Sequence, residues 1–135
     1  MAITVPHEWR VTNEPLDYIS DPIQRLVVSS YRVPRGGPNA SGTYVVPPGQ
    51  VLAQLDEQVP PDADAPGFPQ RPTRFAVPRL TNRLEGHTGR WGEITFRQRG
   101  RDFYLFVGVG VGADGQIRLG RLLGLLDGLK VAKAP

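Results

Sequence analysis

The stretch that decides the fold is residues 90–130, which read RWGEITFRQRGRDFYLFVGVGVGADGQIRLGRLLGLLDGLK. Its first half contains two runs of strand-forming residues on either side of Gly100-Arg101. Its second half repeats leucine at helical spacing. The pattern predicts a two-stranded hairpin, a glycine-rich hinge and an amphipathic helix.

The predicted hairpin turns at Gly100-Arg101. A glycine at the first position of a two-residue loop suits a type II′ turn, and Arg99 then faces Asp102. Side chains alternate between the two faces of a strand, so one face of the hairpin collects the apolar residues. They are Ile94, Phe96, Phe103, Leu105, Val107 and Val109. We expect this face to lie in the core.

The opposite face of the hairpin is mixed. It carries Trp91, Glu93, Thr95, Arg97, Tyr104 and Phe106, with bare backbone at Gly108 and Gly110. In one interpretation a second layer partly covers this face, and Trp91 shields the glycines. In the other the face is a binding surface, because exposed Trp, Tyr and Arg side chains are frequent interface anchors. The candidate binding residues are Trp91, Arg97, Tyr104 and Phe106.

The helical spacing after the hairpin involves Leu119, Leu122, Leu123, Leu126 and Leu129. We expect Asp114 to cap the start of this helix, and Lys130 and Lys133 to follow its last turn. Three glycines lie inside the pattern, and each costs about 1 kcal/mol of helix propensity relative to alanine. They are Gly120, Gly124 and Gly128. Two explanations stay open: close packing of the helix against the sheet or a second helix, or a helix–helix dimer face.

The first half of the chain predicts further strands and a second short helix. Strands are expected at residues 9–11, 24–33 and 43–46, and another near residues 75–77. Pro47-Pro48-Gly49 is expected to open a helix in which Val51, Leu52, Leu55 and Val59 share a face. Six prolines follow within residues 60–78 and indicate a long irregular connection.

No cofactor and no metal site are expected. Gly108, Gly110 and Ala113 match the GxGxxA spacing of dinucleotide-binding loops, but that motif needs a following parallel strand with an acidic residue. The predicted helix is instead followed within a few residues by Pro135. The chain has no cysteine, and neither His7 nor His87 has the spacing of a metal-ligand set.

No catalytic residues can be assigned from the sequence. Nucleophilic catalysis needs a Ser, Thr or Cys beside a His with an orienting acid, and the serines here lie outside any nucleophile elbow. We therefore expect a non-enzymatic protein. One alternative is a small hydrolase-type enzyme whose site is built from loops around His87, with Glu85 and a Ser or Asp. Another is a structural or self-associating subunit joined through the small residues of the helix, a possible homo-oligomer.

Composition limits the size and the partners of the protein. The chain has 135 residues, enough for a single domain spanning residues 1–135. Its 16 basic residues include only two lysines, a bias typical of GC-rich bacterial genomes. Eight arginines lie between Arg71 and Arg101, but the formal net charge is only +3 and no nucleic-acid motif is present. No nucleic-acid partner is therefore expected.

The sequence leaves the compartment open. No hydrophobic signal segment precedes Ile3, which fits a cytoplasmic protein or an exported domain with its leader removed. The apolar part of the C-terminal helix is shorter than the roughly 20 residues needed to cross a membrane, so no membrane span is expected.

Several segments carry a resemblance to a known group of proteins. They are Pro6-His7-Glu8-Trp9 before the first predicted strand, the run LVVSS at residues 26–30, and residues 123–130, which end in a Leu-Lys pair. The predicted order is strand, strand, helix, long connection, hairpin and terminal helix. In both respects the chain resembles the Mog1/PsbP-like group, although it lacks the cysteine that starts the group's exported lipoproteins. The resemblance implies a small non-enzymatic domain that binds or assists other proteins.

Together these patterns predict an α+β fold: an antiparallel sheet with a C-terminal amphipathic helix packed on one face and a second short helix. The expected function is recognition of another protein or peptide.

Overall fold

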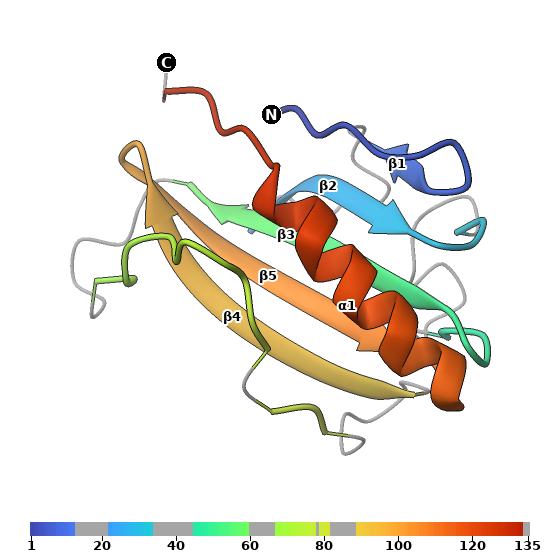
Figure 1. Cartoon of the computed structure of the whole chain (residues 1–135). Coiled ribbons are helices and arrows are strands. Elements are labelled where there is room, and N and C mark those ends of the chain that lie inside the picture. Colours follow the sequence, from blue (N-terminus) through green and yellow to red (C-terminus); the bar gives the residue numbers. More distant parts are fainter. Residues whose placement is uncertain (13–21, 34–44, 60–66, 78, 82–88, 134–135) are drawn as a thin grey trace.

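The structure is a computed structural model that describes residues 1–12, 22–33, 45–59, 67–77, 79–81 and 89–133. The regular elements of these residues are β1 (Arg10–Thr12), β2 (Ile23–Ser29), β3 (Val51–Gln58), β4 (Arg90–Gln98), β5 (Arg101–Val109) and α1 (Ala113–Asp127). The strands form one antiparallel sheet in the order β1-β2-β3-β5-β4, and α1 lies across one of its faces (Figure 1). The predicted α+β class and the packing of the C-terminal helix on the sheet are therefore confirmed.

The β4–β5 hairpin forms, but its turn lies one residue earlier than predicted. Gln98 pairs with Arg101, which leaves Arg99 and Gly100 as the two loop residues. Their φ angles are 53° and 74°, and positive φ at both positions is the mark of a type I′ turn. The predicted type II′ turn at Gly100-Arg101 is therefore wrong. The resulting pairing differs from the predicted one by two residues, so every side chain keeps its predicted face.

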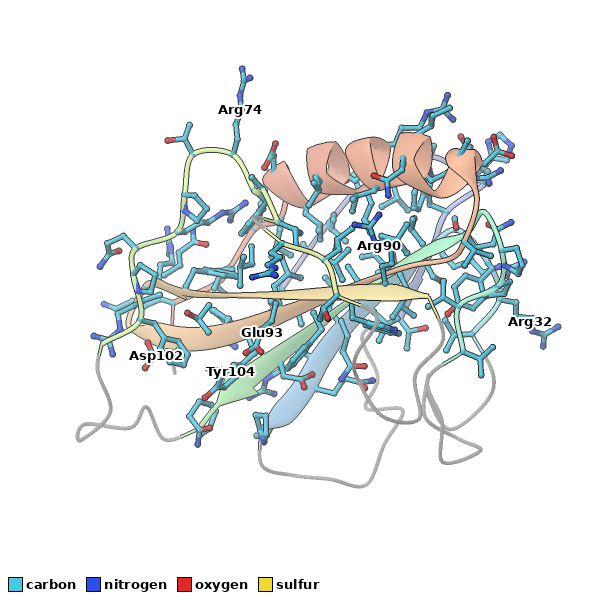
Figure 2. The ribbon with its side chains drawn as sticks, turned by 90° about the horizontal axis from the view of Figure 1, so that it is seen from below. Arg32, Arg74, Arg90, Glu93, Asp102 and Tyr104 are labelled. Atoms are coloured by element: carbon cyan, nitrogen blue, oxygen red, sulfur yellow. The ribbon has the colours of Figure 1, made fainter. Side chains whose placement is uncertain are left out.

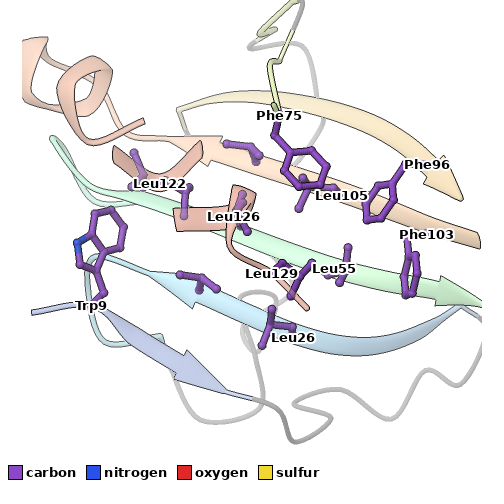
Figure 3. Packing of buried hydrophobic residues seen from close by; sticks show 14 of the residues in the cluster. Trp9, Leu26, Leu55, Phe75, Phe96, Phe103, Leu105, Leu122, Leu126 and Leu129 are labelled. Atoms are coloured by element: carbon purple, nitrogen blue, oxygen red, sulfur yellow. The ribbon is translucent and has the colours of Figure 1, made fainter. Parts of the chain in front are cut away.

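The face beneath α1 forms the core, as the alternation in the hairpin predicts. Five of the expected apolar residues are buried and Ile94 is partly buried: the five are Phe96, Phe103, Leu105, Val107 and Val109. Leu122 and Leu126 of α1 pack onto them, as does Leu129 just beyond the helix (Figure 3). Each fully buried side chain of this size stabilises the fold by about 1.5–3 kcal/mol. This one cluster accounts for the orientation of α1 on the sheet.

The predicted second helix is wrong, because Val51–Gln58 forms β3, the central strand of the sheet. Strands β2 and β5 flank it, and seven of its eight residues are buried. A strand that is covered on both faces loses the usual alternation of apolar and polar residues. The run of Val51, Leu52 and Leu55 therefore fits a helical period as well as a strand, and only the pairing with neighbouring strands decides between them.

The outer edge of β4 is partly covered by the segment at residues 67–77. The backbone N–H of Arg97 donates to the Pro69 carbonyl at 2.7 Å, and the N–H of Arg71 donates to the Arg97 carbonyl at 3.0 Å. Residues 75–77 do not form the predicted strand, and neither do residues 45–46; residues 43–44 lie outside the described residues. The predicted strands at residues 9–11 and 24–33 correspond to β1 and β2, although β2 ends at Ser29.

The glycines of α1 differ in their surroundings. A Cβ added to Gly120 or Gly124 would meet nothing within 4 Å, so the predicted close packing at these two positions is wrong. Close approach occurs instead at Gly115, where an added Cβ would lie 2.5 Å from the Gly110 carbonyl oxygen. The helix begins after Gly112, and Asp114 therefore lies in its first turn and does not cap it.

Candidate binding surface

The sheet face away from α1 carries polar and aromatic side chains in cross-strand rows. One row runs from β2 to β4 as Gln24, Asp56, Tyr104 and Thr95; the next is Val27, Gln54, Phe106 and Glu93; the third is Ser29, Leu52, Gly108 and Trp91. Figure 2 shows Tyr104 and Glu93 on the side of the sheet opposite the helix. Two of the four residues predicted to bind, Tyr104 and Phe106, lie at the middle of these rows.

Three partly exposed rings meet on this face. Tyr104 stacks on Phe106 with ring centroids 6.3 Å apart and planes inclined by 14°. Phe68, from the segment beside β4, contacts Tyr104 edge to face at 5.1 Å. Aromatic side chains provide a large contact area and lose little conformational entropy when they bind. We name these three rings, together with Glu93 and Thr95, the aromatic surface.

Trp91 lies on this face, but its side chain is buried. It is only 4% exposed and packs in a cluster with Val27, Val46 and Leu52. A Cβ added to Gly108 would lie 2.7 Å from the indole ring, so Trp91 covers this stretch of bare backbone. The structure thus places Trp91 as a support for the surface, in line with the shielding interpretation, and not as an exposed anchor.

Arg97 is engaged within the hairpin. Its Nε and Nη2 donate to the two carboxylate oxygens of Asp102 at 2.6 Å and 3.0 Å, in the bidentate geometry that arginine favours. This hydrogen bonding with Asp102 raises the pKa of the Arg97 guanidinium. Because Asp102 already compensates its charge, Arg97 stabilises the hairpin near its turn and does not offer a free cation.

Glu93 provides an uncompensated negative charge on the aromatic surface. It is exposed and lies directly opposite Phe106 in the β4–β5 pairing. Within the described ranges its carboxylate has no ion pair, whereas Asp102 is paired with Arg97. Asp56, the other carboxylate in these rows, accepts hydrogen bonds from Gln54 Nε2 at 3.1 Å and 3.2 Å. Glu93 is therefore free to contact a ligand.

Two buried glutamines lie beside the aromatic surface. Gln24 on β2 is 5% exposed and Gln54 on β3 is 7% exposed. Gln24 Nε2 and Gln54 Oε1 are buried and have no hydrogen-bond partner in the described structure. A buried polar atom without a partner costs about 1–3 kcal/mol. The row that contains Phe106 thus has an unused acceptor on β3 in addition to the carboxylate on β4.

Two hollows lie elsewhere, at the ends of α1. One of about 590 Å³ is bordered by Arg71, Arg99 and Lys130 near the end of the helix, and one of about 290 Å³ lies beside Gly112 at its start. Neither is lined by Phe68, Tyr104 or Phe106. The described hollows therefore do not extend onto the aromatic surface.

Other kinds of site find no support in the described part of the chain. No three His, Cys, Asp or Glu side chains of the described residues lie close enough together to hold a metal ion. No helix in the same part of the chain has the length and apolar character needed to cross a membrane. His87 and Glu85, on which the hydrolase-type alternative depends, lie outside the described residues.

The sequence interpretation missed Phe68, Gln24, Gln54 and Asp56 as neighbours of the predicted binding residues. Phe68 belongs to a segment interpreted as an irregular connection, and Gln54 and Asp56 to a segment interpreted as a helix. The alternation of Leu52, Gln54 and Asp56 with apolar residues is a signal that could have placed them on one strand face.

Comparisons of the chain with known protein families, with curated proteins and with solved structures each find no match.

Proposed function

We propose that the protein is a non-enzymatic binding or accessory module, which recognises another protein or peptide through the aromatic surface. The observation that carries this proposal is the group of three partly exposed rings, Phe68, Tyr104 and Phe106, beside the unpaired carboxylate of Glu93. Aromatic side chains are enriched in protein interfaces, where they account for much of the binding energy.

The arrangement of the surface favours a polypeptide ligand. The rings come from β5 and from the segment at residues 67–77, and polar side chains of β3 and β4 flank them. An extended peptide can lay apolar side chains on the rings while its polar groups reach the neighbouring rows. A rigid antiparallel sheet beneath the rings limits the ordering that binding requires.

The resemblance to the Mog1/PsbP-like group leads to the same class of function. The order of elements on which that resemblance rests includes a helix where the structure has β3. For this reason the proposal is based on the aromatic surface and not on the resemblance.

The proposal is tested by selecting peptides from a displayed random library on the immobilised full-length protein. The wild type is expected to enrich related peptides, and the double variant Tyr104→Ala, Phe106→Ala is expected to lose this enrichment. Ile117→Ala is the matched control, because Ile117 is apolar, 60% exposed and lies on α1, on the other side of the sheet.

All three proteins should still unfold cooperatively, since the altered side chains are at least partly exposed. Equal enrichment by the wild type and the double variant would remove the aromatic surface from consideration. A wild type that enriches no peptide at all would contradict the proposed function itself.

A further inference from the structure

We propose that the aromatic surface receives a basic side chain, lysine or arginine, of the partner. This inference rests on the proposed binding function and adds the chemistry of the group that is recognised. It follows from three properties of the row formed by Gln54, Phe106 and Glu93: a partly exposed ring, a carboxylate without an ion pair in the described residues, and an unused buried acceptor.

The rings provide the first contact. Tyr104 and Phe106 are stacked and partly exposed, and Phe68 extends the ring cluster at the edge of Tyr104. The face of an aromatic ring carries partial negative charge and attracts an ammonium or guanidinium group placed over it. Arg97, a cation of the neighbouring β4–β5 pair, is bound to Asp102 and does not occupy this position.

The charge of Glu93 provides the second contact. Glu93 lies directly opposite Phe106 in the β4–β5 pairing, on the same sheet face, and its carboxylate has no ion-pair partner in the described part of the chain. A cation above the Phe106 ring would therefore gain an ion pair as well as a cation–π contact. An acidic side chain in the same place would meet repulsion from Glu93.

Gln54 independently indicates that the ligand donates hydrogen bonds. Its Nε2 donates to both oxygens of Asp56, and this fixes the amide so that Oε1 is the free end. Oε1 is buried and has no partner in the described structure. Lysine and arginine side chains only donate hydrogen bonds, so they match a row whose unpaired atoms within the described residues, Gln54 Oε1 and the Glu93 carboxylate oxygens, only accept.

Recognition of this kind acts at short range. The chain as a whole carries a formal net charge of +3, so its overall field does not attract a basic ligand. Binding of a basic side chain must therefore depend on the local contacts with Phe106, Tyr104 and Glu93. Single substitutions at these positions are then expected to have a measurable effect.

The experiment is a titration followed by two-dimensional NMR of the full-length ¹⁵N-labelled protein. The probe is a short glycine peptide with one central lysine, and the comparison peptides carry N-acetyl-lysine or glutamate at the same position. The lysine peptide is expected to shift the amide signals of Glu93, Thr95, Tyr104 and Phe106. Acetylation removes the charge at nearly unchanged length and should abolish these shifts.

Two variants test the contacts separately. Glu93→Gln should weaken binding of the lysine peptide about twofold to fivefold through loss of the ion pair, and Phe106→Leu by a similar factor through loss of the ring. Glu8→Gln is the control for net charge, because Glu8 is an exposed carboxylate just before β1, at the opposite edge of the sheet from β4. It should leave the affinity unchanged.

Two results would overturn the inference: acetyl-lysine or glutamate peptides that bind as tightly as the lysine peptide, or equal affinities for Glu93→Gln and Glu8→Gln. The peptide selection separates this failure from that of the proposed function. Enriched peptides that depend on Tyr104 and Phe106 but lack basic residues would keep the binding function and reject the basic side chain.

Discussion

The Arg71 guanidinium binds the backbone carbonyl of Leu129, with Nη1 2.6 Å from the oxygen. Its Nη2 also donates to the carbonyls of Leu126 and Asp127, at 3.2 Å and 3.0 Å. The last carbonyls of a helix lack partners within the helix, and a cation there also meets the negative end of the helix dipole. Because Arg71 lies on the segment that runs beside β4, it joins the end of α1 to the edge of the sheet.

Loss of this contact is expected to destabilise the fold. Arg71→Ala should lower the free energy of unfolding by about 1.5–3 kcal/mol, the range for hydrogen bonds to a charged group. Arg71→Lys should recover only part of this, because lysine keeps the charge but not the planar fork. Urea denaturation measures both effects. Arg74→Ala serves as the control, since Arg74 is exposed and points away from the sheet (Figure 2); equal stabilities of Arg71→Ala and Arg74→Ala would contradict the assignment.

The buried carboxylate of Glu57 links stability to pH. Burial by itself raises the pKa of Glu57, but the hydrogen bonds and charges of Arg101 and Arg25 outweigh it and hold the pKa below the ordinary value of 4.5. Arg101 Nη2 lies 2.7 Å from Oε1 and Arg25 Nε lies 2.9 Å from the same oxygen. A carboxyl whose pKa is lower in the folded state binds its proton more readily in the unfolded chain.

The ion pair of Glu57 should therefore stabilise the protein fully above about pH 4.5 and progressively less as the pH falls through the folded pKa. Urea midpoints measured between about pH 3 and pH 7 should fall on acidification in the wild type, and less steeply in Glu57→Gln. At pH 7 this substitution should cost roughly 3 kcal/mol, because it leaves two arginines without their partner. Equal slopes in the two proteins would assign the acid sensitivity to other groups.

Trp91 should be essential for folding and not directly for binding. Trp91→Ala would empty a site next to Gly108 on the outer sheet face, where the indole is only 4% exposed. The expected cost is about 3–5 kcal/mol of unfolding free energy, against about 1 kcal/mol for the partly exposed Tyr104→Ala. Urea denaturation of the two variants compares them directly. Similar stabilities would mean that Trp91 does not support the sheet in this way.

Local sequence patterns were sufficient for the hairpin and the terminal helix. Alternation in β4 and β5 identified the core side of both strands, and the error in the turn at Arg99-Gly100 was harmless because it moved the pairing by two residues. The candidate residues Tyr104 and Phe106 follow from the same alternation. Their position on the outer face required nothing beyond the period of a strand.

The central strand could not be predicted in this way. In β3 both faces are covered, so the alternation is limited to Gln54 and Asp56 among apolar residues, and the sequence VLAQLDEQ is rich in helix formers. The polar neighbours of the binding surface, Gln54 and Asp56, belong to this strand and were missed with it. The burial of Trp91 likewise depends on Val27 and Leu52 from distant strands, which no local pattern relates to the hairpin.

The exposed glycines of α1 offer a gain in stability. A Cβ at Gly120 or Gly124 meets nothing within 4 Å, so alanine adds helix propensity without a clash. Each substitution should raise the free energy of unfolding by about 0.5–1 kcal/mol. Gly115→Ala is the control in the same helix, because its Cβ would lie 2.5 Å from the Gly110 carbonyl oxygen. It should destabilise; a loss of stability at Gly120 would indicate instead that this helix face contacts another chain.

Arg99 in the hairpin turn has a strained backbone conformation, and a substitution can relieve this strain. Arg99 has a φ of 53°, in the left-handed region that asparagine tolerates better than other side chains, and Gly100 already follows it. Arg99→Asn creates the Asn-Gly pair that type I′ turns prefer and should stabilise the protein by about 0.5–1 kcal/mol. Arg90→Asn, within strand β4, should instead cost stability, because asparagine is disfavoured in strands. Thermal unfolding of the two variants should give shifts of opposite sign, and a destabilised Arg99→Asn would contradict the expected relief of strain at this position.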